Sequence, residues 1–120
     1  MSLTITRRVP TPIMHRVVEH AGVLHLGGVV ADDWTLDAAG QMTQIAEKID
    51  ALLESHGSTS RNLLSATIFV ADFADKPAID AVWKQWLEAD HLPARATLAV
   101  ADLGDDVLVE IVCTAAVNAA

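Results

Sequence analysis

The chain has 120 residues, 52 % of them hydrophobic, and a formal net charge of −8. This length suits one domain with a substantial core, so we expect a single domain over residues 1–120. The acidic balance argues against a nucleic-acid partner, because phosphate binding needs clustered Lys and Arg. No apolar run approaches a membrane span, and we expect neither membrane association nor a secretory leader. The single cysteine, Cys113, excludes an internal disulfide and favours a cytoplasmic location.

Three short strands are predicted before the first helix. Thr4–Val9 has the pattern of a strand that Pro10 and Pro12 would end. Arg16–His20 and Val23–Val29 are predicted to pair as a hairpin, with its turn at Ala21-Gly22.

The first helix is the most strongly patterned element, with Asp37 or Thr35 as its N-cap and Gly57 as its C-terminal signal. Its apolar residues recur at helical spacing: Met42, Ile45, Ala46, Ile49, Leu52 and Leu53. A second helix begins near Pro77 and is expected to stop before Pro93. It carries a second apolar stripe: Ile79, Val82, Trp83, Trp86 and Leu87.

Three more strands are predicted around the second helix, at Leu63–Ala71, Ala96–Ala101 and Val107–Val117. The resulting order, β-β-β-α-β-α-β-β, predicts an α+β fold with a mixed six-stranded sheet and two helices on one face. Ile68, Phe69 and Val70 are apolar in succession, so both faces of the sheet must leave water. Because two helices cover only one face, we expect the second face to be buried between subunits.

Two charged residues interrupt the predicted strands. Arg95 follows Pro93-Ala94 at the start of one strand, and Glu110 lies fifteen residues later within an apolar strand. Buried charges are costly and usually have a partner or a task. Arg95 has the geometry to bind a carboxylate with two hydrogen bonds, and Glu110 has the chemistry to orient or deprotonate a water. The alternative is an internal Arg95–Glu110 ion pair with a structural role.

Other candidate sites carry weaker signals. The five histidines, His15, His20, His25, His56 and His91, match no metal-binding motif, so we predict no metal site. Gly27-Gly28 resembles half of a phosphate loop, but no Lys-Ser/Thr follows it. Glycines in a strand more often allow another group to approach the backbone closely.

Several segments together resemble the Rid family, the reactive intermediate deaminases, also called YjgF-like proteins and labelled endoribonuclease L-PSP. The similarity covers nearly the whole chain, and the Pro-Ala-Arg segment with its distant acid is the specific part. The matching segments are Leu26-Gly27-Gly28-Val29-Val30, Asp37-Ala38-Ala39-Gly40-Gln41, Ala66-Thr67-Ile68-Phe69-Val70-Ala71-Asp72, Pro93-Ala94-Arg95 and Val109-Glu110-Ile111.

The resemblance implies a homotrimer of chorismate-mutase-like fold, with active sites in the clefts between subunits. It also implies hydrolytic deamination of enamine or imine intermediates, such as 2-aminoacrylate, to 2-oxo acids and ammonia. An imine is already electrophilic, so no metal, flavin or other cofactor is expected. Arg95 takes the place of the family's carboxylate-binding arginine, and Glu110 that of its water-activating glutamate.

The candidate binding residues around this pair are His15, Gly27, Gly28, Asp80 and Thr97. Four of them depart from the family pattern: His15 lies near the position of its tyrosine, Gly27 replaces its serine, Thr97 its cysteine and Asp80 its asparagine. The substrate therefore stays open among imines. The alternatives are a non-catalytic module that binds a small carboxylate, and an endoribonuclease or translation inhibitor, which the acidity of the chain disfavours.

Overall fold

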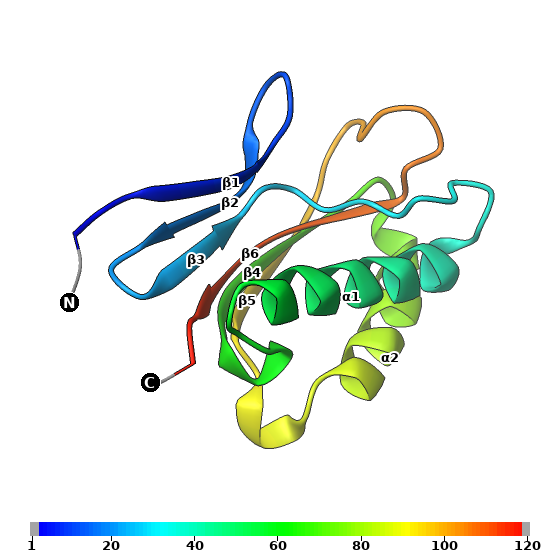
Figure 1. Ribbon diagram of the computed structural model, residues 1–120. Helices are drawn as coiled ribbons and strands as arrows, with labels where there is room; N and C mark the ends of the chain where they lie inside the picture. Colours follow the sequence, from blue (N-terminus) through cyan, green and yellow to red (C-terminus); the bar gives the residue numbers. More distant parts are fainter. Residues whose placement is uncertain (1–2, 119–120) are drawn as a thin grey trace.

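A computed structural model describes residues 3–118 as one six-stranded sheet with two α-helices (Figure 1). The strand order is β1-β2-β3-β6-β4-β5, in which β4 and β5 are parallel and the other neighbours antiparallel. The elements are β1 (Thr6–Pro10), β2 (His15–His20), β3 (Val23–Leu26), α1 (Ala38–Ser55), β4 (Leu63–Val70), α2 (Lys76–Trp86), β5 (Ala94–Ala99) and β6 (Val109–Ala116). The predicted α+β fold and its element order are confirmed.

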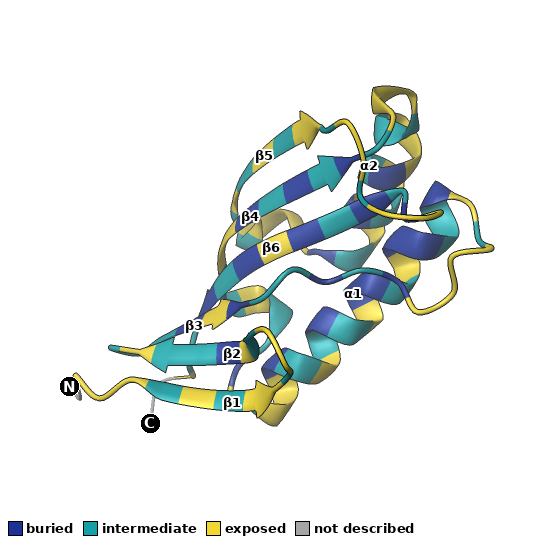
Figure 2. Cartoon of the chain, turned by 90° about the horizontal axis from the view of Figure 1, so that it is seen from above, coloured by how far each residue is buried: buried dark blue, intermediate teal, exposed yellow. Residues whose placement is uncertain are grey.

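Both helices lie on the same side of the sheet, as Figures 1 and 2 show. We call this side the core face and the opposite side the open face. Strand alternation assigns residues to the two faces: Val109 and Ile111 of β6 are fully buried, whereas Val112 is 38 % exposed. Ala66 of β4 pairs with Cys113 of β6, and both are buried on the core face.

Helix α1 begins and ends where its sequence signals predict. Asp37 is the N-cap, and its Oδ1 accepts a hydrogen bond of 2.9 Å from the backbone N–H of Gly40. Gly57 follows the helix with φ of +76°, a left-handed conformation that glycine adopts without steric cost. Thr35 is not the cap; its hydroxyl donates to Asp33 Oδ1 instead.

Helix α2 is shorter than predicted. It ends at Trp86, because Leu87 already has an extended backbone and places its side chain in the core. A 3₁₀ turn, Ala89–His91, then leads to Pro93 and β5. The short helix still presents Ile79 and Trp83 to the core, as the spacing predicted.

Several strand boundaries also differ from the prediction. β3 ends at Leu26; beyond it, the Gly27 N–H donates to the Arg16 oxygen at 2.9 Å and Val29 forms an isolated bridge to Ile111. β5 begins two residues earlier than predicted, at Ala94, and is Ala94–Ala99 rather than Ala96–Ala101. The parallel ladder with β4 fixes this start by pairing Ala94 with Ser65.

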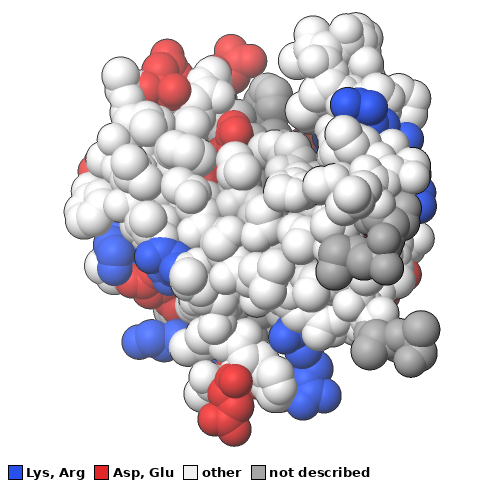
Figure 3. Space-filling model, turned by 90° about the vertical axis from the view of Figure 1, so that its left-hand side faces the viewer, with Lys and Arg blue, Asp and Glu red and all other residues white. Residues whose placement is uncertain are grey.

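The open face is uncovered and contains apolar side chains. On this face, Leu98 of β5 is 46 % exposed and Val112 of β6 is 38 % exposed. Figure 3 views the side away from the helices and shows a broad uncharged area with most charged groups near its margin. The predicted second apolar face is therefore present in the single chain. Among residues 3–118, no helix is long and apolar enough to span a membrane.

Candidate functional site

Arg95 lies on the core face at the edge of the sheet. The parallel ladder aligns Arg95 with Ala66 and Thr97 with Ile68, and both partners are buried under the helices. This register directs Arg95 towards helix α2, where its guanidinium carbon lies 4.8 Å from the ring centroid of Trp83. Only 18 % of the Arg95 side chain is exposed, so the stacking and its polar contacts must offset the cost of burying its charge.

The guanidinium group of Arg95 is already held on two edges. Nε and Nη2 donate to Thr97 Oγ1 at 3.1 and 2.9 Å, and Nη2 also donates to Asp80 Oδ1. Nη1 has no hydrogen-bond partner among residues 3–118. The structure thus brings three of the predicted site residues together, with one guanidinium nitrogen left for a ligand.

Asp80 sits between two cations. Its Oδ2 accepts a hydrogen bond of 2.6 Å from Lys76 Nζ, one helical turn earlier, and its Oδ1 faces Arg95. Burial by itself would raise the pKa of Asp80, but the hydrogen bonds and charges of Lys76 and Arg95 outweigh it and lower the pKa below the usual value. Asp80 is therefore ionised at neutral pH.

An open groove of about 540 Å³ adjoins this cluster on the outer side of α2. Lys76 and Asp80 belong to both the groove and the Arg95 cluster, so a ligand in the groove lies next to the ion pairs. The remaining lining residues are Phe73, Pro77, Ala81 and Lys84. The groove combines apolar surface with polar groups at one wall, as small-molecule sites commonly do.

Glu110 lies on the open face, in the middle of β6. It pairs with Phe69 of β4, between the fully buried Val109 and Ile111 whose side chains point the other way. Its carboxylate packs against the backbone of Gly28, where a Cβ would overlap Oε2. Glu110 makes no ion pair with any residue from 3 to 118.

The alternative prediction of an internal ion pair between Arg95 and Glu110 is wrong. Arg95 shares a face with Ala66 and hence with Cys113, and Glu110 precedes Cys113 by an odd number of residues. Because successive side chains alternate across a strand, Arg95 and Glu110 point to opposite faces. Arg95 forms its ion pair with Asp80 instead.

The remaining predicted residues lie on the Gly27-Gly28 segment and at the start of β2. Gly28 contacts the Glu110 carboxylate directly, and a Cβ at Gly27 would be 2.8 Å from the sulfur of Met14. His15 is half-buried at the start of β2, and its backbone oxygen lies 3.7 Å from that same Cβ position. The structure therefore groups Arg95, Thr97 and Asp80 on the core face and places Glu110 beside Gly28 on the open face.

Two members of the Arg95 cluster were missed from the sequence. Trp83 was interpreted as core packing, which is correct but incomplete, because its ring also stacks under Arg95. Lys76 is absent from the predicted site residues, although it contacts Asp80. Its spacing of four residues from Asp80 was the available signal, since such pairs meet on one helix face.

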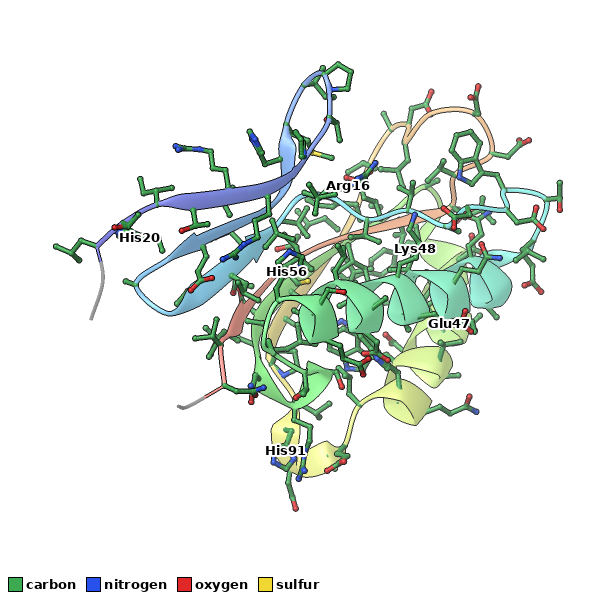
Figure 4. The ribbon with its side chains drawn as sticks, viewed as in Figure 1. Arg16, His20, Glu47, Lys48, His56 and His91 are labelled. Atoms are coloured by element: carbon green, nitrogen blue, oxygen red, sulfur yellow. The ribbon has the colours of Figure 1, made fainter. Side chains whose placement is uncertain are left out.

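Three histidines lie on separate parts of the chain, and Cys113 is buried. Figure 4 shows His20, His56 and His91 on separate parts of the chain: at the end of β2, just after α1 and in the 3₁₀ turn before β5. Within residues 3–118, no three His, Cys, Asp or Glu side chains come together as metal ligands. Burial raises the pKa of the Cys113 thiol to about 12, so Cys113 is a packed core residue without a reactive thiolate.

Comparison with known proteins identifies the family. The family described as Endoribonuclease L-PSP matches residues 9–117. The chain is 38 % identical over 101 residues to the RutC family protein YoaB of Escherichia coli K12, covering 84 % of this chain and 88 % of that protein. The chain belongs to the Rid/YjgF/L-PSP family.

Two further similarities bear on its fold and chemistry. A solved member of the YjgF protein family from Neisseria meningitidis superimposes with a TM-score of 0.94 at 30 % identity, covering 98 % of both chains. The 3-aminoacrylate deaminase RutC of Acinetobacter baylyi is 31 % identical over 97 residues, which cover 81 % of this chain and 69 % of that protein. The six-stranded sheet with two helices is thus the fold of the Rid family.

Proposed function

We propose that this Rid-family protein is a cofactor-independent deaminase that hydrolyses carboxylate-bearing enamines and imines to 2-oxo acids and ammonia. Family membership and the similarity to a 3-aminoacrylate deaminase support this reaction class. Two observations carry the proposal: among residues 3–118, Arg95 Nη1 has no hydrogen-bond partner and Glu110 has no ion-pair partner. The first is suited to bind a carboxylate and the second to activate water.

The two groups meet only if they come from different subunits. Arg95 and Glu110 face opposite sides of the sheet within one chain, whereas the uncovered apolar open face is suited to contact a second copy. We therefore place the active site in the cleft between neighbouring subunits of a homotrimer. A molar mass near three times the monomer's 12.8 kDa in multi-angle light scattering is expected. A monomeric mass at micromolar concentration would contradict the shared site.

The reaction needs only these groups and water. Arg95 binds the substrate's carboxylate and orients the imine carbon, and Thr97 keeps the guanidinium in place through its oxygen. Glu110 takes a proton from water as the water oxygen bonds to the imine carbon, and the C=N electron pair moves to nitrogen, which receives that proton from Glu110. Glu110 then takes the hydroxyl proton of the carbinolamine as the carbonyl forms and passes it to nitrogen as the C–N bond breaks, so that a 2-oxo acid and ammonia leave.

A coupled assay tests this proposal. An amino-acid oxidase generates 2-imino acids in the presence of the purified protein, and the rate of 2-oxo acid formation is followed. The protein is expected to accelerate this rate above that of spontaneous hydrolysis. Absence of acceleration by the folded protein contradicts the deaminase, and carboxylate binding without turnover would favour a non-catalytic binding module.

A further inference from the structure

The hydrogen bonds of Arg95 leave little room for a second carboxylate. A guanidinium grips a carboxylate best through two parallel N–H groups, along either its Nε–Nη2 edge or its Nη1–Nη2 edge. Thr97 Oγ1 occupies the first edge, and Asp80 Oδ1 accepts from Nη2 on the second. An incoming carboxylate must therefore displace Asp80 or accept a hydrogen bond from Nη1 alone.

Asp80 is well held in this position. Its second oxygen accepts from Lys76 Nζ at 2.6 Å, and only 24 % of its side chain is exposed. Asp80 also lines the groove beside α2, so its negative charge faces any ligand that approaches Arg95 from there. A like charge at such short range opposes the binding of an anion.

We propose that Asp80 is a specificity-determining residue, an internal carboxylate that competes with the substrate's carboxylate for Arg95. This inference rests on the proposed function, in which Arg95 holds the substrate. Asp80 lowers the affinity for small monocarboxylates and thus favours substrates that gain further contacts in the groove, where Phe73 and Pro77 offer apolar surface and Lys84 a cation. Lys76 retains Asp80 when a ligand displaces it from Arg95.

The test measures the affinity of the full-length protein and its variants for pyruvate, a minimal 2-oxo acid. Asp80→Asn keeps the shape and removes the charge, and we expect it to bind pyruvate about tenfold more tightly by calorimetry. The same gain is expected in KM, rather than in kcat, for the imine derived from alanine. Asp80→Ser, measured in parallel, removes the same charge. If one of the two variants misfolds, the other still tests the proposal.

Asp90→Asn is the matched control, since it removes one negative charge from an exposed residue in the 3₁₀ turn, outside the groove. It should change the Kd for pyruvate less than twofold, roughly the effect of an exposed charge. Unchanged or weaker pyruvate binding by both folded Asp80 variants overturns the competition. If the variants bind more tightly but no protein hydrolyses imines, the competition stands and the deaminase proposal fails.

Discussion

The two charged residues of the candidate site, Arg95 and Glu110, differ in how their charges are stabilised. Arg95 on the core face is stacked on Trp83, bonded to Thr97 and paired with Asp80. Glu110 on the open face has glycine backbone beside it and no cation among residues 3–118. A charge with internal partners is stable within one chain, whereas Glu110 needs water or another subunit. The proposed intersubunit site accounts for this difference: Arg95 is pre-positioned by its own subunit, and we propose that a second copy completes the site.

The largest effect is expected from Arg95, since the proposed mechanism binds the substrate's carboxylate through its guanidinium group. Arg95→Ala should abolish measurable imine hydrolysis in the coupled assay. Arg95→Lys should restore little, because an ammonium cannot reproduce the planar fork or its stacking on Trp83. Circular dichroism and light scattering provide the control for folding and assembly. A folded Arg95→Ala oligomer that keeps its activity would remove Arg95 from the mechanism.

Glu110→Gln is expected to lower turnover by about 10²–10⁴, the usual loss for a missing acid–base group. Thermal unfolding should stay close to wild type, because Glu110 has no ion pair with residues 3–118 to lose. Pyruvate should still bind, since Arg95 remains. A variant that melts much earlier yet keeps most of its activity would make Glu110 a structural residue.

Mixing the two inactive variants tests the comparison directly. If each site takes Arg95 from one subunit and Glu110 from the next, trimers mixed from Arg95→Ala and Glu110→Gln subunits contain some intact sites. Random assembly after joint refolding should restore about a quarter of wild-type activity. Each variant refolded alone is the control. No recovery in proven mixed oligomers would show that the two groups do not share an intersubunit site.

Alanine substitutions at Gly28 and Gly27 form a matched pair, and the expected change in turnover is smaller. A Cβ at Gly28 forces the Glu110 carboxylate to move, whereas one at Gly27 meets the flexible end of Met14. Gly28→Ala should therefore reduce turnover by about 10²-fold, as expected when a catalytic group is displaced. Both variants should unfold within about 1 kcal/mol of wild type, since each obstacle is a mobile side-chain end. Equal activities of the two variants would argue against the observed position of Glu110.

The sequence predicted much more of the fold than of the site. Helix α1 was readable because Asp37 and Gly57 are local signals, and the face of Glu110 was implicit in its buried neighbours Val109 and Ile111. The face on which Arg95 lies could not be predicted, because the sequence Ala-Arg-Ala-Thr-Leu-Ala of β5 has no clear apolar alternation. Only the long-range ladder with β4 decides it. The contact between Asp80 and Arg95 depends in turn on how α2 crosses that strand.

The smallest effect is expected with RNA, where the prediction is no measurable binding. The family description Endoribonuclease L-PSP makes this a real alternative. However, five of the eight Lys and Arg residues form ion pairs with carboxylates: Arg8, Lys48, Arg61, Lys76 and Arg95. Figure 4 shows Arg16 and Lys48 on different elements, β2 and α1, rather than along one basic stripe.

A protein that binds RNA releases counterions, so its affinity must fall steeply with salt. With five of its eight cations held in ion pairs and a net charge of −8, this chain should give no shifted band in a gel-shift titration at physiological salt. Lowering the salt should not produce a complex either, because the acidic surface repels phosphate more strongly as screening decreases. Arg95→Ala is the informative comparison: imine hydrolysis should vanish in this variant while any trace nuclease activity stays the same. A salt-dependent complex, with cleavage that coelutes with the protein and is lost with Arg95, would revive the ribonuclease function and place it in the same site.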